Sequence, residues 1–211
     1  MNKNIIIRKE TKEDYKKTEY MVMRTFWNLH GPGCNEHLLV RKLRESEDFL
    51  PEYTRVAELD GEIVGAIFYS RAWVEDKDKV HDIITFGPLA VDPIHENEGI
   101  GRMLLEETIK EVKKAGYLGI AILGEPDYYP KWGFERGEKY QICCEYGYID
   151  PLMVYPLNDG FENVHGKLVE SHVFEEVEDE AEIAKMNKEF PYHKPLKLEC
   201  QWLHVEKLGQ I

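Results

Sequence analysis

The sequence predicts an α/β fold with one mixed sheet, and two patterns support this prediction. Asp60-Gly61 stands between two strand-like segments, and this dipeptide favours the type I′ turn of an antiparallel hairpin. Further on, an amphipathic segment at 100–115 separates strand-like segments at 81–91 and 118–123, which is the pattern of a strand–helix–strand crossover. A hairpin and a crossover together indicate a mixed sheet flanked by helices.

The N-terminal part is predicted to form a strand and then a helix. Residues 4–9 are strand-like, and Thr11 is a suitable helix N-cap with Glu13 and Asp14 in the first turn. We expect this helix to continue to about Trp27.

A loop, a second helix and the hairpin follow. Glycine and proline make a loop over 28–35, and the apolar spacing predicts a short amphipathic helix over 36–46. The hairpin strands are expected at 53–59 and 62–70.

The strand at 81–91 is interrupted by Gly87-Pro88. Because proline has no amide hydrogen to donate to a neighbouring strand, we expect this strand to bulge or splay there. The helix at 100–115 should end at Gly116, and the unbroken apolar run at 118–123 is typical of a buried strand.

Composition excludes several function classes. The chain has 211 residues, 43% of them hydrophobic, which suits one α/β domain with a short appended region. The net charge of −13 argues against nucleic-acid binding and weakly favours cationic amines as partners. No apolar run is long enough for a membrane helix, and the first ten residues lack the apolar core of a signal peptide. We therefore expect a cytoplasmic protein without a membrane partner.

The four cysteines predict neither a disulfide framework nor a metal site. Cys143 and Cys144 are adjacent, while Cys34 and Cys200 stand alone. Cys200 and His204 have the spacing of two zinc ligands, but a structural zinc site needs a second such pair. We expect reduced thiols and no metal cofactor.

The segment at 91–105 is the first candidate for ligand binding. Its strand ends at Val91, and Gly99-Ile100-Gly101 opens the long helix. Glycines let backbone N–H groups approach an anion and the helix dipole favours it, so a pyrophosphate is a suitable ligand. An ordinary helix start with two tight-turn glycines is the alternative. Leu104 at the third glycine position excludes a Rossmann fingerprint, and no Gly-Lys-Ser/Thr follows as in a P-loop.

A second candidate segment, 124–137, contains Tyr128 and Tyr129 and then Gly133-Phe134. A tyrosine hydroxyl can protonate a leaving group when its pKa suits the task. The same residues can equally be half-buried aromatics with hydrogen-bonded hydroxyls. Residue types alone leave both interpretations open.

Together, V-D-P-x5-G-x-G and the later Y-Y-P-x-W-G-F resemble the GNAT superfamily of N-acetyltransferases. Nearly the whole chain resembles a bacterial subgroup of predicted acetyltransferases, through segments at 27–49, 85–93, 123–134, 190–195 and 198–203. The resemblance implies a GNAT-like, mostly antiparallel sheet with a splayed central strand over 1–155. A C-terminal extension over 156–211 would pack on the same domain.

The resemblance also implies a reaction, the transfer of an acetyl group from acetyl-CoA as cosubstrate to a primary amine of a small molecule or protein. Main-chain groups of Leu89, Ala90 and Val91 would hold the pantetheine arm and polarise the thioester carbonyl. Tyr129, four residues before the Gly-Phe pair, would protonate the departing thiolate, with Tyr128 packed beside it. The pyrophosphate would lie on the loop and helix start formed by Glu96, Asn97, Glu98, Gly99, Ile100, Gly101 and Arg102.

Glu96 departs from the family pattern, in which this position is usually Gln or Arg. Carboxylates at Glu96 and Glu98 are electrostatically unfavourable near a pyrophosphate unless they point away or pair with Arg102. The alternative function is therefore a non-catalytic acyl-CoA-binding or interaction module on the same fold.

The base that takes a proton from the amine is left unassigned. His81 and Asp82 at the start of the central strand are candidates, and Thr85 can instead orient a water. The loop from His30 to His37 is the expected roof of the acceptor site, because the corresponding connection borders that site in GNAT folds. Cys34 in this loop leaves an acyl-cysteine route open.

Residues 156–211 are expected to cap the sheet or the acceptor cleft, or to pair with a second subunit in a homodimer. The patterns predict a hairpin over 161–174, an amphipathic helix over 178–190 and a last strand or covering arm over 191–205.

Overall fold

A computed structural model of the protein describes residues 4–77, 79–198 and 201. Four α-helices and nine strands lie within these residues. The helices are α1 (Tyr15–Phe26), α2 (Glu36–Leu43), α3 (Ile100–Ala115) and α4 (Glu180–Asn187). The strands are β1 (Ile6–Lys9), β2 (Arg55–Leu59), β3 (Glu62–Asp76), β4 (Lys79–Val91), β5 (Gly119–Leu123), β6 (Glu135–Arg136), β7 (Ile142–Cys143), β8 (Leu152–Pro156) and β9 (Gly166–Glu170).

The strands form one sheet in the order β1-β2-β3-β4-β5-β8-β6, and β9 pairs with both β3 and β7. The β4–β5 and β7–β9 pairs are parallel, whereas the others are antiparallel. A mixed, mostly antiparallel sheet is therefore confirmed. The order of elements up to β5 is also the predicted one.

Two predicted turns have the expected backbone geometry. Between β2 and β3, Asp60 and Gly61 have φ angles of 52° and 84°, and positive values at both positions are what a type I′ turn requires. α3 ends at Gly116, whose φ of 92° forms a left-handed C-cap.

β4 bulges at Gly87-Pro88, as predicted. Ile67 of β3 lies opposite Leu89, while Tyr69 lies opposite Phe86. Three steps along β4 therefore correspond to two steps along β3, which places one extra residue in β4. The bulge occurs where proline cannot donate a hydrogen bond.

On its other edge, β4 pairs with β5 at a single position. β4 and β5 pair where Ile84 lies opposite Ile120. Within the described part of the chain, no pairing joins residues 87–91 to β5. Among the described strands, the carboxyl end of β4 thus pairs only with β3, which leaves a gap between β4 and β5.

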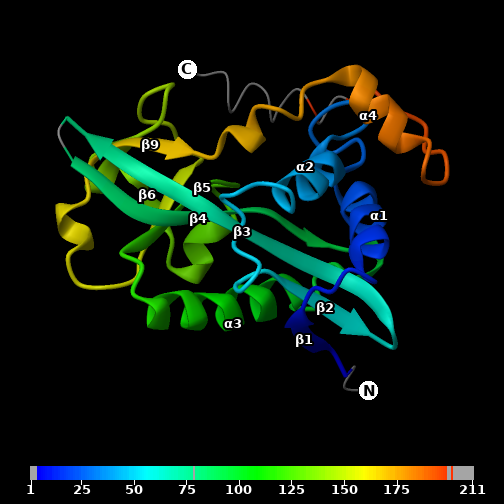
Figure 1. Ribbon diagram of the computed structural model, residues 1–211, viewed down its shortest axis with the longest axis horizontal. Coiled ribbons are helices and arrows are strands. Elements are labelled where there is room, and N and C mark those ends of the chain that lie inside the picture. Colours follow the sequence, from blue (N-terminus) through cyan, green and yellow to red (C-terminus); the bar gives the residue numbers. More distant parts are fainter. Residues whose placement is uncertain (1–3, 78, 199–200, 202–211) are drawn as a thin grey trace.

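Helices cover both faces of the sheet (Figure 1). α3 packs on one face, the α3 face, where Leu104 joins Ile84 and Phe86 in a buried cluster. α1 and α2 pack on the opposite face, the α1/α2 face, where Leu38 meets Phe68. α4 lies beside α2 in the same layer. The gap between β4 and β5 therefore has a helical layer on each side.

The start of α1 differs from the prediction. α1 begins at Tyr15 with Asp14 in the N-cap position, so Thr11 is not the N-cap. The Asp14 carboxylate accepts hydrogen bonds from the Thr11 amide at 2.8 Å and from the Thr11 hydroxyl at 2.9 Å. It also pairs with Arg8. These contacts hold Thr11 in a turn that precedes the helix.

The C-terminal segment also differs from the prediction. The hairpin expected over 161–174 is a single strand, β9, which pairs with β3 and β7 and so extends the sheet. α4 forms where the amphipathic helix was predicted. Residues 191–198 contain no strand. The rest of the predicted arm, including Cys200 and His204, lies outside the described residues apart from Gln201.

Candidate functional site

The gap beside β4 presents main-chain groups that no strand of the described chain occupies. Leu89, Ala90 and Val91 pair with β3, and the main-chain groups of Leu89 and Val91 alternate toward the other edge, where the gap lies. The Ala90 side chain is buried on the α1/α2 face, and those of Leu89 and Val91 are half-buried on the α3 face. α1 supports this end of β4, because the Thr25 hydroxyl donates to the Val91 carbonyl at 3.0 Å.

The loop after β4 is shaped by Asp92, which is 4% exposed. Its carboxylate accepts a hydrogen bond from the Ile94 amide at 3.1 Å and pairs with Arg24 of α1. Asn97 and Gly99 then take positive φ angles of 62° and 82°. These conformations turn the chain into the start of α3.

The first amides of α3 are available to a ligand. Among the described residues, no acceptor bonds the amides of Ile100, Gly101 or Arg102. Such amides, together with the helix dipole, attract an anion. Gly101 also has a steric role, because a Cβ there would lie 2.9 Å from the Tyr128 hydroxyl. A glycine therefore allows the helix start and the tyrosine pair to lie in contact.

The carboxylates of the loop are exposed and do not pair with Arg102. Glu98 lies 3.2 Å from the Nδ1 of His95, and Arg102 donates to Glu106 at 2.7 Å. The pairing of Arg102 with Glu96 or Glu98 that would offset their charge is absent from the described structure. Their exposure to solvent weakens the repulsion of a bound anion instead.

Tyr129 lies across the gap between β4 and β5. Its ring centroid is 5.8 Å from that of Phe86 in β4 and 5.4 Å from that of Phe134. On the β5 side, a side chain at Gly124 would overlap the Tyr129 ring. Burial raises the pKa of Tyr129, and the nearby Tyr128 raises it further. The phenol therefore keeps its proton at neutral pH and can donate it to an anion formed in the gap.

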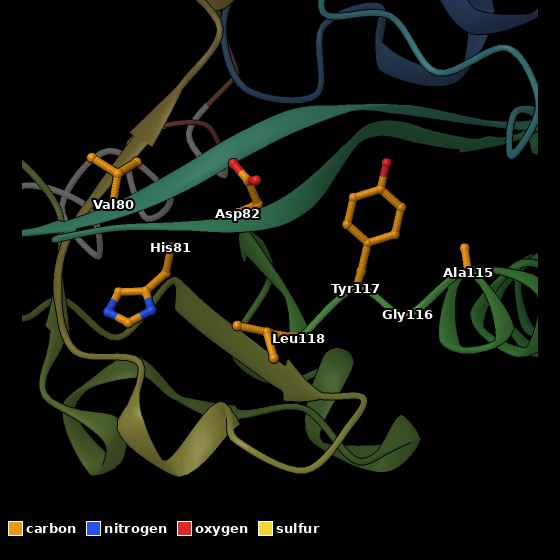
Figure 2. A pocket seen from close by; sticks show the side chains of 7 residues that line it. All are labelled: Val80, His81, Asp82, Ala115, Gly116, Tyr117 and Leu118. Carbon is orange, nitrogen blue, oxygen red and sulfur yellow. The ribbon is translucent and has the colours of Figure 1, made fainter.

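His81 and Asp82 lie far from this gap. They line a pocket of about 400 Å³ with Val80, Ala115, Gly116, Tyr117 and Leu118, at the start of β4 (Figure 2). Figure 2 shows their side chains on opposite sides of the strand. Asp82 precedes Leu89 by seven residues, which is about 23 Å of extended strand. Neither residue is placed to take a proton near Leu89.

Thr85 has a partner that the sequence patterns did not reveal. Its hydroxyl, buried on β4, donates to the Oε1 of Glu170 at 3.3 Å. Burial raises the pKa of Glu170 to about 7, and the Thr85 hydrogen bond opposes this rise. The sequence did contain one signal for this contact. Side chains alternate along a strand, so Glu170 lies on the same side of β9 as the buried Leu168.

Cys34 in the loop over 28–35 forms a Cys–His–Asn arrangement with His37 of α2 and Asn187 of α4. Cys34 Sγ lies 3.5 Å from His37 Nδ1, and His37 Nε2 lies 2.8 Å from Asn187 Oδ1 of α4. Burial raises the pKa of the Cys34 thiol, and the Glu36 carboxylate adds to this. Burial also lowers the pKa of His37 to about 4. Both groups are therefore neutral, which disfavours the thiolate that an acyl-cysteine route needs.

The loop is held in place by the C-terminal segment. The Asn28 side chain accepts hydrogen bonds from the Gly33 amide at 3.0 Å and the Leu196 amide at 2.9 Å. Gln201 donates to the Asn28 carbonyl at 2.8 Å. The described residues contain no group of three metal-ligating side chains and no helix that is long and apolar enough to cross a membrane.

Comparison with known proteins connects this geometry to a family. A family model for the acetyltransferase (GNAT) domain matches residues 50–136, which include the β4 gap, the start of α3 and Tyr129. A relative from Escherichia coli K12, described as the uncharacterized N-acetyltransferase YhbS, is 28% identical over 169 residues. These residues are 80% of this chain and 96% of the relative.

Two solved structures share the fold. The crystal structure of E. coli YhbS in complex with CoA has a TM-score of 0.72 and 26% identity, covering 83% of this chain and 94% of YhbS. A GNAT acetyltransferase from Brucella melitensis in complex with acetyl-CoA has a TM-score of 0.65, covering 82% of this chain and 99% of its own. At 23% identity this second structure supports the fold alone.

Proposed function

We propose that the chain is a GNAT acetyltransferase and that it transfers the acetyl group of acetyl-CoA to a primary amine. Membership of this family would make it an acyltransferase. We assign the reaction to residues 1–155 and treat residues 156–211 as an extension that completes the acceptor side.

One observation carries the proposal, the position of the unbonded amides at the start of α3 next to the gap between β4 and β5. A CoA thioester has a pyrophosphate at one end and an extended arm that leads to the thioester. The amides of Ile100, Gly101 and Arg102 suit the pyrophosphate. The main chain of Leu89–Val91 suits the arm. The CoA-bound structure of YhbS supports this choice of donor.

The chemistry follows from these positions. The amine nitrogen attacks the thioester carbonyl carbon, and the carbonyl oxygen gains negative charge. Backbone amides of the Leu89–Val91 segment that face the gap would stabilise that oxygen. When the carbon–sulfur bond breaks, the thiolate takes the proton of Tyr129. The amine nitrogen loses its proton to a base or to water, and Tyr129 regains a proton from solvent, so the products are an N-acetylated amine and CoA with a free thiol.

The acceptor is assigned by class alone. The net charge of −13 favours cationic amines through long-range attraction. Glu96 and Glu98, exposed beside the helix start, are the feature that supports the alternative of an acyl-CoA-binding module without turnover.

Two measurements on the same sample distinguish the proposals. Calorimetry with acetyl-CoA measures binding, and a thiol reagent measures CoA release with a panel of diamines, amino sugars and lysine peptides. We expect binding together with amine-dependent release. Binding without release across the panel would favour the module, and absence of binding would contradict both functions.

A further inference from the structure

Glu170 is a carboxylate for which the proposed reaction has so far given no role. It ends β9, in the C-terminal extension, outside the residues 50–136 that match the family model. Its half-buried side chain accepts a hydrogen bond from Thr85 of β4, although 85 residues separate the two in sequence. We propose that Glu170 is the general base that takes the proton from the attacking amine, and this inference rests on the proposed acetyl transfer.

Strand register places Glu170 on the acceptor side of the sheet. Ala72 of β3 lies opposite Glu170 of β9 and opposite Ile83 of β4, while Ser70 lies opposite Thr85. Opposed residues share a face, and side chains alternate along a strand. Glu170 and Thr85 therefore lie on the α1/α2 face. The start of α3 and the Tyr129 ring lie on the other face, so the donor and the acceptor would approach the gap from opposite sides.

The segment after Glu170 follows β4 toward the gap. A Cβ at Gly87 would lie 3.3 Å from the ring of Phe174. Glu170 beside Thr85 and Phe174 beside Gly87 thus line the β4 bulge that leads to Leu89. Thr85 precedes Leu89 by four residues, about 13 Å of extended strand. At this distance the proton of an amine at the thioester would pass to the carboxylate through a chain of waters along this face, and not by direct contact.

A second observation indicates a polar ligand here. The hydroxyl of Ser70 is buried and has no hydrogen-bond partner among the described residues. It belongs to the residue directly opposite Thr85. A buried hydroxyl without a partner is costly, and an acceptor amine or a water would satisfy it. Ser70, Thr85 and Glu170 together form a polar patch among buried apolar residues of this face.

The surroundings of Glu170 suit a base that works near neutral pH. The residues of β3 and β4 that lie near Glu170 on this face are Ser70, Ala72 and Thr85, and none of them is charged. His172, which follows β9, is exposed and pairs with Glu176. Burial is the main cause that raises the pKa of Glu170 to about 7. The carboxylate would accept the amine proton as the carbon–nitrogen bond forms, and it would later release that proton to solvent.

The test is the pH profile of kcat for acetyl transfer at saturating concentrations of the fastest amine of the panel, because kcat reports the groups that ionise in the enzyme–substrate complex. We expect the wild-type rate to fall about tenfold per pH unit below pH 7, as the base is protonated. Glu170→Gln should lower kcat by about 100-fold and leave the Kd of acetyl-CoA unchanged. It should also remove the fall in rate below pH 7, which is the acidic limb of the profile. Glu170→Asp should keep the limb at a reduced rate. Glu75→Gln, an exposed carboxylate on β3, is the matched control and should behave as wild type.

If Glu170→Gln does not fold, the variant Thr85→Val tests the same role of Glu170. The Thr85 hydrogen bond lowers the pKa of Glu170, so Thr85→Val should move the limb to higher pH. A wild-type limb in Glu170→Gln, or an unmoved limb in Thr85→Val, would overturn the role of Glu170 while acetyl transfer stands. A wild-type protein that releases no thiol with any amine would overturn acetyl transfer itself and this inference with it.

Discussion

Burial gives Tyr129 the protonation state that a general acid needs. Its ring is enclosed by Phe86, Phe134 and Tyr128, and this burial raises its pKa. A neutral phenol holds its proton until an anion forms beside it. The thiolate left by the breaking carbon–sulfur bond is such an anion, so the proton would be transferred at the step that needs it.

Replacing Tyr129 should therefore affect turnover more than binding. Tyr129→Phe keeps the ring and removes the proton, so we expect kcat to fall by about 100-fold or more, with little change in the Kd of acetyl-CoA. Steady-state thiol release and calorimetry measure the two quantities. Tyr128→Phe is the matched control and should keep kcat within about threefold. Equal effects of the two substitutions on kcat would contradict the assignment.

Cys34 is predicted to have no covalent role. Its thiol and the neighbouring His37 are both neutral in the folded protein, so the nucleophilic thiolate is disfavoured. We expect Cys34→Ala to keep kcat within about threefold, because general acid–base steps do not involve it. Mass spectrometry of wild type mixed with acetyl-CoA should show no acetylated protein. An acetyl adduct on Cys34, lost with activity in the variant, would establish the acyl-cysteine route.

At the scale of elements, the site depends on β4 and α3 together. The bulge at Gly87-Pro88 and the single meeting point with β5 open the gap, and the start of α3 supplies amides at its end. Gly101 holds these parts together, since a Cβ there would approach the Tyr128 hydroxyl. A small change at this position should therefore disturb both packing and donor binding.

A double-mutant cycle separates these two effects. Gly101→Ala should lower the melting temperature and raise the Kd of acetyl-CoA about tenfold, by crowding the helix start that binds the anion. Adding Tyr128→Phe removes the hydroxyl 2.9 Å from the new Cβ, and we expect it to restore stability without restoring affinity. Thermal melting and calorimetry give the two readouts. Full recovery of the affinity would mean that the glycine acts only through packing.

Local signals explain which elements were predictable. The turn at Asp60-Gly61, the bulge at Gly87-Pro88 and the end of α3 at Gly116 each depend on residues within a few positions, and all three were predicted. The start of α1 was not predicted correctly, because the Asp14 carboxylate accepts hydrogen bonds from Thr11 and holds it in a turn before the helix. Such competition between neighbouring polar groups is decided by geometry that a pattern does not contain.

Contacts that are distant in sequence explain what the patterns missed at the site. Thr85 was a candidate from its place on β4, but its partner Glu170 is brought in by the pairing of β9 with β3. His81 and Asp82 were plausible by residue type, yet they lie on the wrong side of the point where β4 meets β5. Residue types indicate candidate site residues, but the strand pairing of the sheet determines which of them lie close together.

At the scale of the whole molecule, Glu170 couples folding to pH. Its pKa is raised to about 7 from an ordinary value of 4.5, so between these values the folded state binds a proton that the unfolded state has released. Stability therefore falls as pH rises through this window, and the loss is complete above pH 7. The ionised carboxylate of the folded protein is the source of this cost.

The substitution that removes this ionisation should be stabilising at high pH. Glu170→Gln should exceed wild type in free energy of unfolding by about 1–3 kcal/mol at pH 8, and the difference should shrink toward zero at pH 5. Urea titrations at the two pH values measure it. A difference that is the same at pH 5 and pH 8 would show that Glu170 does not carry the raised pKa.

The central claim is that one CoA thioester occupies the start of α3 and the gap beside β4 at once. A crystal structure with acetyl-CoA measures this directly. We predict the pyrophosphate within hydrogen-bond distance of the amides of Ile100–Arg102, and the thioester between Leu89 and the Tyr129 hydroxyl. Acetyl-CoA bound elsewhere, or a gap closed by pairing of residues 87–91 with β5, would contradict the account.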